Sequence, residues 1–158
     1  MQKLYRSIRI IIADDHEIYR DGLRSILSHN DNIQLVAEAA DGSGLLQVTA
    51  TSDPDVILTD IKMPVMNGIE ATRQLSAKFL HIAVVALTMF NEEHHIIDML
   101  AAGAKGYVLK DAPKTEIITA IGTVHRNGNY FCSAIAKKVS SLIAQKIFNP
   151  DLKEKTIP

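Results

Sequence analysis

The sequence has little of several features that mark specialised classes of protein. It contains one cysteine, Cys132, no tryptophan, and only 8 glycines and 5 prolines in 158 residues. A single cysteine excludes an internal disulfide framework of the kind that stabilises small secreted domains. The low glycine and proline content excludes a collagen-like or low-complexity chain. We therefore expect an ordinary folded protein that suits a reducing compartment.

Excess charge and long apolar runs are missing as well. The 17 basic and 18 acidic residues give a net charge of −1, so the chain has no electrostatic footprint for nucleic acid. The apolar stretch from Ile8 to Ala13 contains Arg9 and stops at Asp14-Asp15, which is too short for a signal peptide or a membrane span. We therefore expect a cytoplasmic protein that binds no membrane and that would need another segment to bind DNA.

Short apolar runs alternate regularly with longer amphipathic stretches. Continuous apolar runs are typical of strands buried on both faces, and we expect strands at 8–13, 33–39, 56–59, 82–87 and 106–109. Between them, apolar residues recur at helical spacing, as Ile117, Ile121 and Val124 do. The alternation predicts an α/β fold with a doubly wound, five-stranded parallel sheet of the flavodoxin type and helices on both faces.

The pattern changes near residue 130. A turn at Asn127-Gly128 precedes an extra helix, predicted from Ser133 to Gln145. The charged residues from Asn149 onward are typical of a linker. We therefore predict one domain over residues 1–130, with a linker helix and tail over 131–158.

Polar side chains follow four of the predicted strands at the point where each strand ends. They are Asp14-Asp15, Asp60, Thr88 and Lys110. Parallel strands end at one edge of the sheet, and ligands bind in the crevice there, so these groups are expected to converge. Three carboxylates brought together repel one another unless a cation lies among them, and Mg²⁺ is the ion that suits carboxylates and phosphate oxygens. Lys110 and Thr88 would then suit a phosphoryl group.

Asp60 is the carboxylate expected to react. Pro64 restricts the loop that follows it, and Asn67-Gly68 forms a turn before the next helix, so the loop would hold the carboxylate at an exposed lip. An aspartate in that position can act as a nucleophile and form an acyl phosphate. Asp14 and Asp15 are better placed as metal ligands around it.

Four segments, in this order and spacing, resemble the receiver domain of bacterial two-component response regulators, which has the CheY-like fold. They are Ile12-Ala13-Asp14-Asp15-His16, Leu58 to Pro64 with Asn67-Gly68-Ile69-Glu70, Ala86-Leu87-Thr88, and Gly103 to Lys110. The resemblance covers roughly residues 7 to 128. The runs Ala102 to Tyr107 and Asn127 to Phe131 resemble the NarL/FixJ branch, in which a LuxR-type helix-turn-helix follows the receiver. No such motif occurs before Pro158.

This resemblance implies a role for each site residue. Asp60 would accept phosphate from a sensor histidine kinase, and Mg²⁺ would be held by Asp14, Asp15, Asp60 and the backbone carbonyl of Lys62. Thr88 and Lys110 would bind the phosphoryl group, and Tyr107 would be the aromatic switch that follows Thr88. Lys62 and Phe90 occupy positions that tune the lifetime of the phosphate. The protein would be a phosphoacceptor switch rather than an enzyme, would form a homodimer when phosphorylated, and would control transcription through a DNA-binding domain beyond Pro158. A receiver that acts alone through protein partners is the alternative.

Simpler interpretations exist for the same residues. Aspartates after strands are often helix caps, an aromatic in a strand such as Tyr107 is more often a core residue than a switch, and His94-His95 are expected on a helix surface. Two other functions also fit an acidic strand edge in part. Haloacid-dehalogenase-type phosphatases carry an acid–base aspartate two residues after the nucleophile, where this chain has Lys62. A flavin- or nucleotide-binding module needs a glycine-rich or hydroxyl-rich phosphate loop, where this chain has Asp14-Asp15-His16-Glu17.

Overall fold

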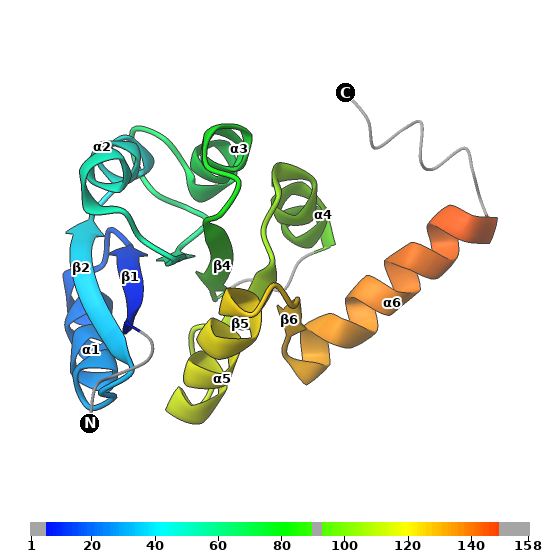
Figure 1. The fold of residues 1–158 in the computed structure, drawn as a ribbon. Coiled ribbons are helices and arrows are strands. Elements are labelled where there is room, and N and C mark those ends of the chain that lie inside the picture. Colours follow the sequence, from blue (N-terminus) through cyan, green and yellow to red (C-terminus); the bar gives the residue numbers. More distant parts are fainter. Residues whose placement is uncertain (1–5, 90–92, 149–158) are drawn as a thin grey trace.

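The computed structural model describes residues 6–89 and 93–148 (Figure 1). Strands and helices alternate along most of this part of the chain. The strands are β1 (Ile8–Ala13), β2 (Ile33–Ala39), β3 (Val56–Thr59), β4 (Ala83–Thr88), β5 (Gly106–Leu109) and β6 (Tyr130–Phe131). The helices are α1 (Glu17–Ser28), α2 (Gly42–Ser52), α3 (Gly68–Lys78), α4 (Glu93–Ala102), α5 (Lys114–His125) and α6 (Ser133–Phe148).

All strands lie parallel in one sheet, in the order β2-β1-β3-β4-β5-β6. The predicted α/β class and doubly wound arrangement are confirmed. The strands in the middle are continuous apolar runs because both of their faces are covered, and every residue of β3 and β4 is buried. The order of the strands reverses between β1 and β3, and in folds of this kind the ligand crevice opens at that point.

Two layers of helices cover the two faces of the sheet. On one face, α1 and α5 pack their apolar residues against β1, β3, β4 and β5, with Leu23, Leu27, Ile117 and Ile121 buried. On the other face, α2, α3 and α4 supply Leu45, Leu75, Ile96 and Met99 to a second core. A helix that buries one apolar stripe against a sheet gains most of its stability from that contact, which is why the helical spacing was readable in the sequence.

The sheet has six strands rather than the five predicted. The additional strand, β6, pairs with β5 through Gly106 and Tyr130 and through Tyr107 and Phe131. A segment of two residues is too short to show any strand periodicity. It adopts a strand conformation because β5 would otherwise leave its backbone hydrogen-bonding groups unpaired at the edge of the sheet.

The helix predicted after residue 130 is present as α6, which begins at the predicted Ser133 and continues past Gln145 to Phe148. The helix leads away from the sheet (Figure 1). Its first turn packs against the core of the domain. Ile135 is fully buried, and Cys132 just before the helix is 7% exposed. Both pack in the same core as Tyr107. The side chains of Leu142 and Ile143 in this helix lie outside the described residues.

The surface position predicted for both His94 and His95 is wrong for His95. His94 is exposed, whereas His95 is 7% exposed, and their ring centroids lie 4.0 Å apart. Helix α4 turns Ile96 and Met99 towards the core, and His95 borders that buried face. Adjacent residues of a helix diverge by about 100°, so one of a pair can be covered while the other stays in water.

Within the described residues, no helix combines the length and the apolar character that crossing a membrane requires.

Candidate functional site

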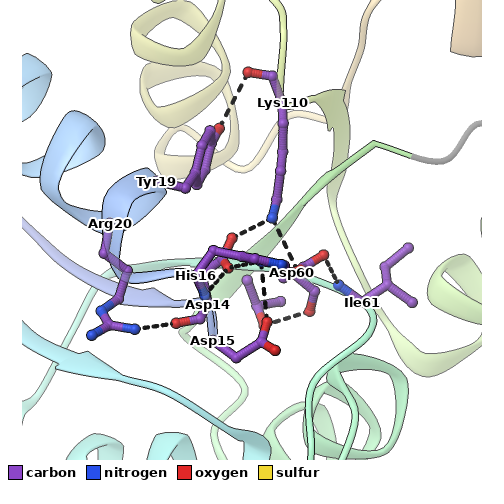
Figure 2. A network of polar contacts seen from close by, with 9 residues as sticks. Asp14, Asp15, His16, Tyr19, Arg20, Asp60, Ile61 and Lys110 are labelled. Carbon is purple, nitrogen blue, oxygen red and sulfur yellow. Dashed lines mark hydrogen bonds and ion pairs between the residues drawn. The ribbon is translucent and has the colours of Figure 1, made fainter.

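Asp14, Asp15, Asp60 and Lys110 meet at the carboxyl ends of β1, β3 and β5 (Figure 2). Backbone hydrogen bonds align these strand ends. The N–H of Asp60 donates to the carbonyl of Ala13 at 2.9 Å, and the N–H of Lys110 donates to the carbonyl of Thr88 at 2.9 Å. The side chains of Asp14, Asp60 and Lys110 therefore come together from different strands, as the sequence predicted.

Lys110 joins the two most buried carboxylates. Its Nζ lies 2.5 Å from Oδ2 of Asp14 and 3.0 Å from Oδ2 of Asp60. All three side chains are almost completely covered, with 7%, 2% and 5% of their surface exposed. Charge-assisted contacts of this length in a buried setting are strong and directional, so the three groups hold one another in place.

Asp60 has both carboxylate oxygens in contact with donors. Oδ1 accepts a hydrogen bond from the N–H of Ile61 at 2.7 Å, and Oδ2 accepts one from Lys110. Burial raises the pKa of the Asp60 carboxyl, while the hydrogen bond and charge of Lys110 act in the opposite direction and the negative charge of Asp14 adds to the increase. The pKa of Asp60 is raised overall, because the effect of burial exceeds the effect of Lys110.

Asp14 and Asp15 differ in exposure. Asp14 is 1% exposed, whereas the Asp15 side chain is 34% exposed and borders solvent. Oδ1 of Asp14 accepts the backbone N–H of His16 at 2.8 Å. His16 itself is the N-cap residue of α1 and makes no side-chain capping hydrogen bond. Asp14 therefore fixes the turn out of β1 and faces the site.

The loop after Asp60 is shaped by close backbone contacts. The N–H of Gly68 donates to the carbonyl of Ile61 at 2.8 Å, and a β-carbon at residue 68 would lie 2.1 Å from the backbone oxygen of Asp60. Only glycine fits there. Asn67 caps α3 by accepting the N–H of Glu70 at 2.9 Å. The turn predicted at Asn67-Gly68 is thus present, and it brings the start of α3 against the strand end that carries Asp60.

The other predicted site residues that the structure describes, Thr88, Tyr107 and Lys62, differ in their burial. Thr88 is the buried last residue of β4, beside Lys110. Tyr107 is completely buried in β5, in the core shared with Ile96 and Ile135, as the alternative core interpretation also expected. The side chain of Lys62 is exposed. Phe90 lies outside the described residues.

Besides His16, three residues of the site were not found by sequence reasoning. Tyr19 lies under the lysine, with its ring centroid 4.7 Å from Nζ of Lys110. Burial, with a further contribution from the negative charge of Asp14, raises the pKa of the Tyr19 hydroxyl. It therefore stays neutral, and its ring face can attract the ammonium group.

The second and third are Arg20 and Glu38. Nη1 of Arg20 donates to the backbone carbonyl of Asp14 at 2.5 Å, and its Nε lies 3.3 Å from Oε1 of Glu38 in β2. A hydrogen bond from Arg24 and, to a smaller extent, the charge of Arg20 lower the pKa of Glu38, so it is a stable anion. The only signal for Arg20 in the sequence is that it follows His16, the N-cap residue of α1, by about one helical turn and so lies on the same side of the helix.

The acidic groups suit a divalent cation. One donor atom each from Asp14, Asp15, His16 and Asp60 lies within 4.8 Å of the others. Two of these carboxylates are buried, and Lys110 supplies a single positive charge. A hard ion with oxygen ligands would balance the remaining charge, so the residues present fit Mg²⁺ as the sequence predicted.

Comparison with known proteins agrees with this arrangement. The response regulator receiver domain family matches residues 10–122. The oxygen regulatory protein NreC of Staphylococcus epidermidis is 39% identical over 124 residues, which are 78% of this chain and 57% of that protein. The transcriptional regulatory protein DegU of Brevibacillus brevis is 37% identical over 123 residues, which are 78% of this chain and 52% of that protein. The chain thus spans a little more than half the length of these relatives.

A solved structure is similar over nearly its whole length. It is the crystal structure of a two-component response regulator of the LuxR family from Aurantimonas sp. SI85-9A1. The TM-score is 0.82 at 28% sequence identity, and the match covers 87% of this chain and 99% of that one.

Proposed function

The chain belongs to the response regulator receiver family, and from this premise we propose that Asp60 accepts a phosphoryl group from a sensor histidine kinase. The observation that carries the proposal is the position of Lys110, whose ammonium group contacts both Asp60 and Asp14. A nucleophilic carboxylate held beside a fixed cation, at the switch point of a doubly wound sheet, is suited to phosphoryl transfer.

The reaction assigned to Asp60 is a displacement at phosphorus. A carboxylate oxygen of Asp60 forms a bond to the phosphorus atom, and the bond from phosphorus to the donor nitrogen of the kinase histidine breaks. The donor leaves with the electron pair, and an acyl phosphate remains on Asp60. The N–H of Ile61 and the ammonium group of Lys110 orient the carboxylate before the reaction.

Asp14, Asp15, Asp60 and the backbone carbonyl of Lys62 would hold Mg²⁺ at this site. The ion, when bound, would neutralise charge on the carboxylates and on the phosphoryl oxygens. Lys110 would exchange part of its contact with the carboxylates for the phosphoryl oxygens, and its buried side chain limits the directions in which its ammonium group can move. As a phosphoacceptor of this kind, the protein would act as a switch that is phosphorylated and dephosphorylated, rather than as an enzyme with an external substrate.

The readout would pass through Thr88 and Tyr107. Thr88 ends β4 next to Lys110, and its hydroxyl would bond the phosphoryl group, with Tyr107 responding to that movement. Lys62 and Phe90 would tune the lifetime of the acyl phosphate. A dianion can act on a partner only by favouring one of two arrangements of the protein, and these residues would form the element that changes.

The output would be control of transcription in the cytoplasm. Residues 1–130 would form the receiver and 131–158 the linker to a DNA-binding domain, as in response regulators of the NarL/LuxR type. Self-association on phosphorylation would use α1 and α5, which border an open groove of about 540 Å³ lined in part by Ile26 and Ile118. Partly buried isoleucines on two neighbouring helices are suited to a second protein surface.

Acetyl phosphate with Mg²⁺ tests the central assignment. Intact-mass measurement should show one added phosphoryl group on the wild-type protein and none on Asp60→Asn. Asp98→Asn, which changes an exposed carboxyl in α4, should be labelled like the wild type. Equal labelling of wild type and Asp60→Asn would refute the assignment. Sustained hydrolysis of a generic phosphate ester would favour the phosphatase alternative.

A further inference from the structure

The contacts that the described side chains of α6 make with the domain lie near the start of the helix. Ile135 in the first turn is fully buried, and Val139 one turn later is partly buried against the same core. Further along, Ser140, Ser141 and Ala144 are exposed, and the helix leads away from the sheet (Figure 1). The position of α6 therefore depends on what packs around Ile135.

The core that receives Ile135 also contains Tyr107. Both side chains are 0% exposed, and Cys132, just before the helix, is 7% exposed. All three belong to one buried cluster with Ile96 and Met99 of α4. Protein interiors are packed as densely as organic crystals, so a ring that moves in such a cluster displaces its neighbours or leaves a void beside them. A movement of Tyr107 would consequently reach the first turn of α6.

Strand β6, which leads into α6, is held more tightly at its start than just beyond its end. The N–H of Tyr130 donates to the carbonyl of Lys105 at 2.9 Å, and its hydroxyl donates to Oε1 of Glu116 in α5 at 3.0 Å. Two residues later, the N–H of Cys132 donates to the carbonyl of Tyr107 at 3.5 Å. That distance exceeds the usual range of about 2.7–3.2 Å. The chain can therefore pivot between β6 and α6 while Tyr130 stays in place.

Tyr107 is connected to the phosphoacceptor edge through β4. It pairs with Ala86 and shares a core with it, and Thr88, two residues further along the strand, lies on the same face of the sheet. A movement of Thr88 towards a phosphoryl group leaves space on the β4 side of Tyr107, and a ring that fills this space withdraws from Ile135.

We propose that phosphorylation of Asp60 releases the first turn of α6 from the domain in this way. The inference rests on the proposed function, and it adds the linker helix as the element that the switch controls. A phosphoryl group can favour the released arrangement only if the two arrangements differ in their contacts, and the packing of Ile135 and Cys132 beside Tyr107 supplies that difference.

The reactivity of one thiol measures this release. Cys132 is the only cysteine in the chain, so an aromatic disulfide reagent reports on the start of α6 alone. A buried thiol reacts slowly, and the wild-type rate should rise about tenfold or more with beryllofluoride and Mg²⁺. Fluorine NMR of bound beryllofluoride shows that the site is occupied. An unchanged or slower thiol rate in the occupied protein would overturn the inference and leave the phosphoacceptor intact. Failure of both beryllofluoride binding and labelling by acetyl phosphate would refute the proposed function, and this inference with it.

A second measurement uses the reciprocity of coupled equilibria. Ile135→Ala should raise the thiol rate without beryllofluoride and should tighten beryllofluoride binding about fivefold, because docking of α6 no longer opposes the movement of Tyr107. Ile135→Val should shift both quantities in the same direction by a smaller amount. Ile117→Ala is the matched control, because it removes an equally buried side chain from the core on the other face of the sheet.

The control should lose stability but keep the wild-type thiol rate and the wild-type affinity for beryllofluoride. A faster thiol reaction in Ile135→Ala without tighter binding would show that α6 docks on this core but is not coupled to the phosphoacceptor. Equal changes in Ile135→Ala and Ile117→Ala would mean general loosening of the fold. Either result would overturn the proposed release.

Discussion

Arg20 holds the backbone of Asp14 directly, because its Nη1 donates to the Asp14 carbonyl oxygen at 2.5 Å. The same guanidinium group is braced by Glu38 of β2, 3.3 Å from its Nε. Arg20 of α1 therefore links the turn that contains Asp14 and Asp15 to the neighbouring strand β2. A buried carbonyl that loses a charged donor costs about 1.5–3 kcal/mol.

Replacement of Arg20 should consequently disturb the site more than the fold. We expect Arg20→Met to lower the free energy of unfolding by about 1.5–3 kcal/mol and to slow labelling by acetyl phosphate about tenfold. Arg24→Met is the control, because Arg24 also pairs with Glu38 but makes no contact with Asp14. Chemical denaturation and labelling rates measure the two effects. Equal slowing in both variants would mean that loss of charge near Glu38, and not the bond to Asp14, is responsible.

The raised pKa of Asp60 predicts a specific dependence of stability on pH. Its carboxyl is protonated more easily in the folded protein than in the unfolded chain, so stability is lost as pH rises from the unfolded-state pKa to the folded-state pKa and changes no further above it. Without metal, Asp60→Asn should therefore melt a few degrees higher than wild type at pH 7, and the difference should vanish below about pH 4. The amide oxygen of the new asparagine can still accept a hydrogen bond from the N–H of Ile61, and Lys110 retains its ion pair with Asp14.

Melting curves between pH 3.5 and 8 in the presence of a chelator measure this effect. Asp98→Asn, an exposed change in α4, should follow the wild-type curve at every pH. A lower melting temperature of Asp60→Asn at pH 7 would show that the contact with Lys110 outweighs the cost of burying the carboxylate.

Val65 has a strained backbone conformation in the loop that follows Asp60. It has φ of 69°, in the left-handed region that β-branched residues avoid, and it is 84% exposed. Val65→Asn and Val65→Gly should raise the free energy of unfolding by about 0.5–1 kcal/mol, because asparagine and glycine adopt this conformation at lower cost. Val65→Ile should leave it unchanged. Denaturant titration distinguishes these outcomes, and a destabilised Val65→Asn would show that the valine side chain has a packing role.

Ile18 is an apolar side chain in the first turn of α1, two residues after His16, and it is 88% exposed. An apolar group next to a phosphoacceptor is suited to contact with the kinase. Ile18→Ser should slow transfer from the cognate histidine kinase about three- to tenfold without changing labelling by acetyl phosphate. Leu80→Ser is the control, because Leu80 is 92% exposed at the opposite edge of the sheet, before β4. A parallel loss with acetyl phosphate would indicate damage to the site itself.

Thr88 is expected to transmit phosphorylation to self-association. Sedimentation at several protein concentrations should show a stronger dimer in the presence of beryllofluoride and Mg²⁺ than without them. Thr88→Ala should lose this response while it is still labelled on Asp60, because a hydroxyl and not a carboxylate has been removed. An unchanged balance of monomer and dimer in labelled wild type would mean that release of a following domain is the output.

Several features were readable from the sequence because they depend on local pattern. The strands over residues 8–13, 33–39, 56–59 and 106–109 have the predicted limits, and β4 is displaced by one residue. Continuous apolar runs that end in a polar residue identify buried strands and the points where they end. The exposed position predicted for the Asp60 carboxylate is wrong, because Asp60 is only 4% exposed beside Lys110. The convergence of Asp14, Asp60 and Lys110 follows from the parallel fold, which brings all carboxyl ends to one edge.

Other features were decided only by the tertiary structure, because they depend on which surfaces meet. β6 exists because β5 offers it an edge, and His95 is buried because of the face that α4 turns to the core. Arg20 and Glu38 carry no recognisable pattern in the sequence, and they form an ion pair only because α1 packs beside β2. Local sequence determines where strands and helices begin and end, whereas the partner of an exposed-looking side chain is fixed by the packing of elements that are distant along the chain.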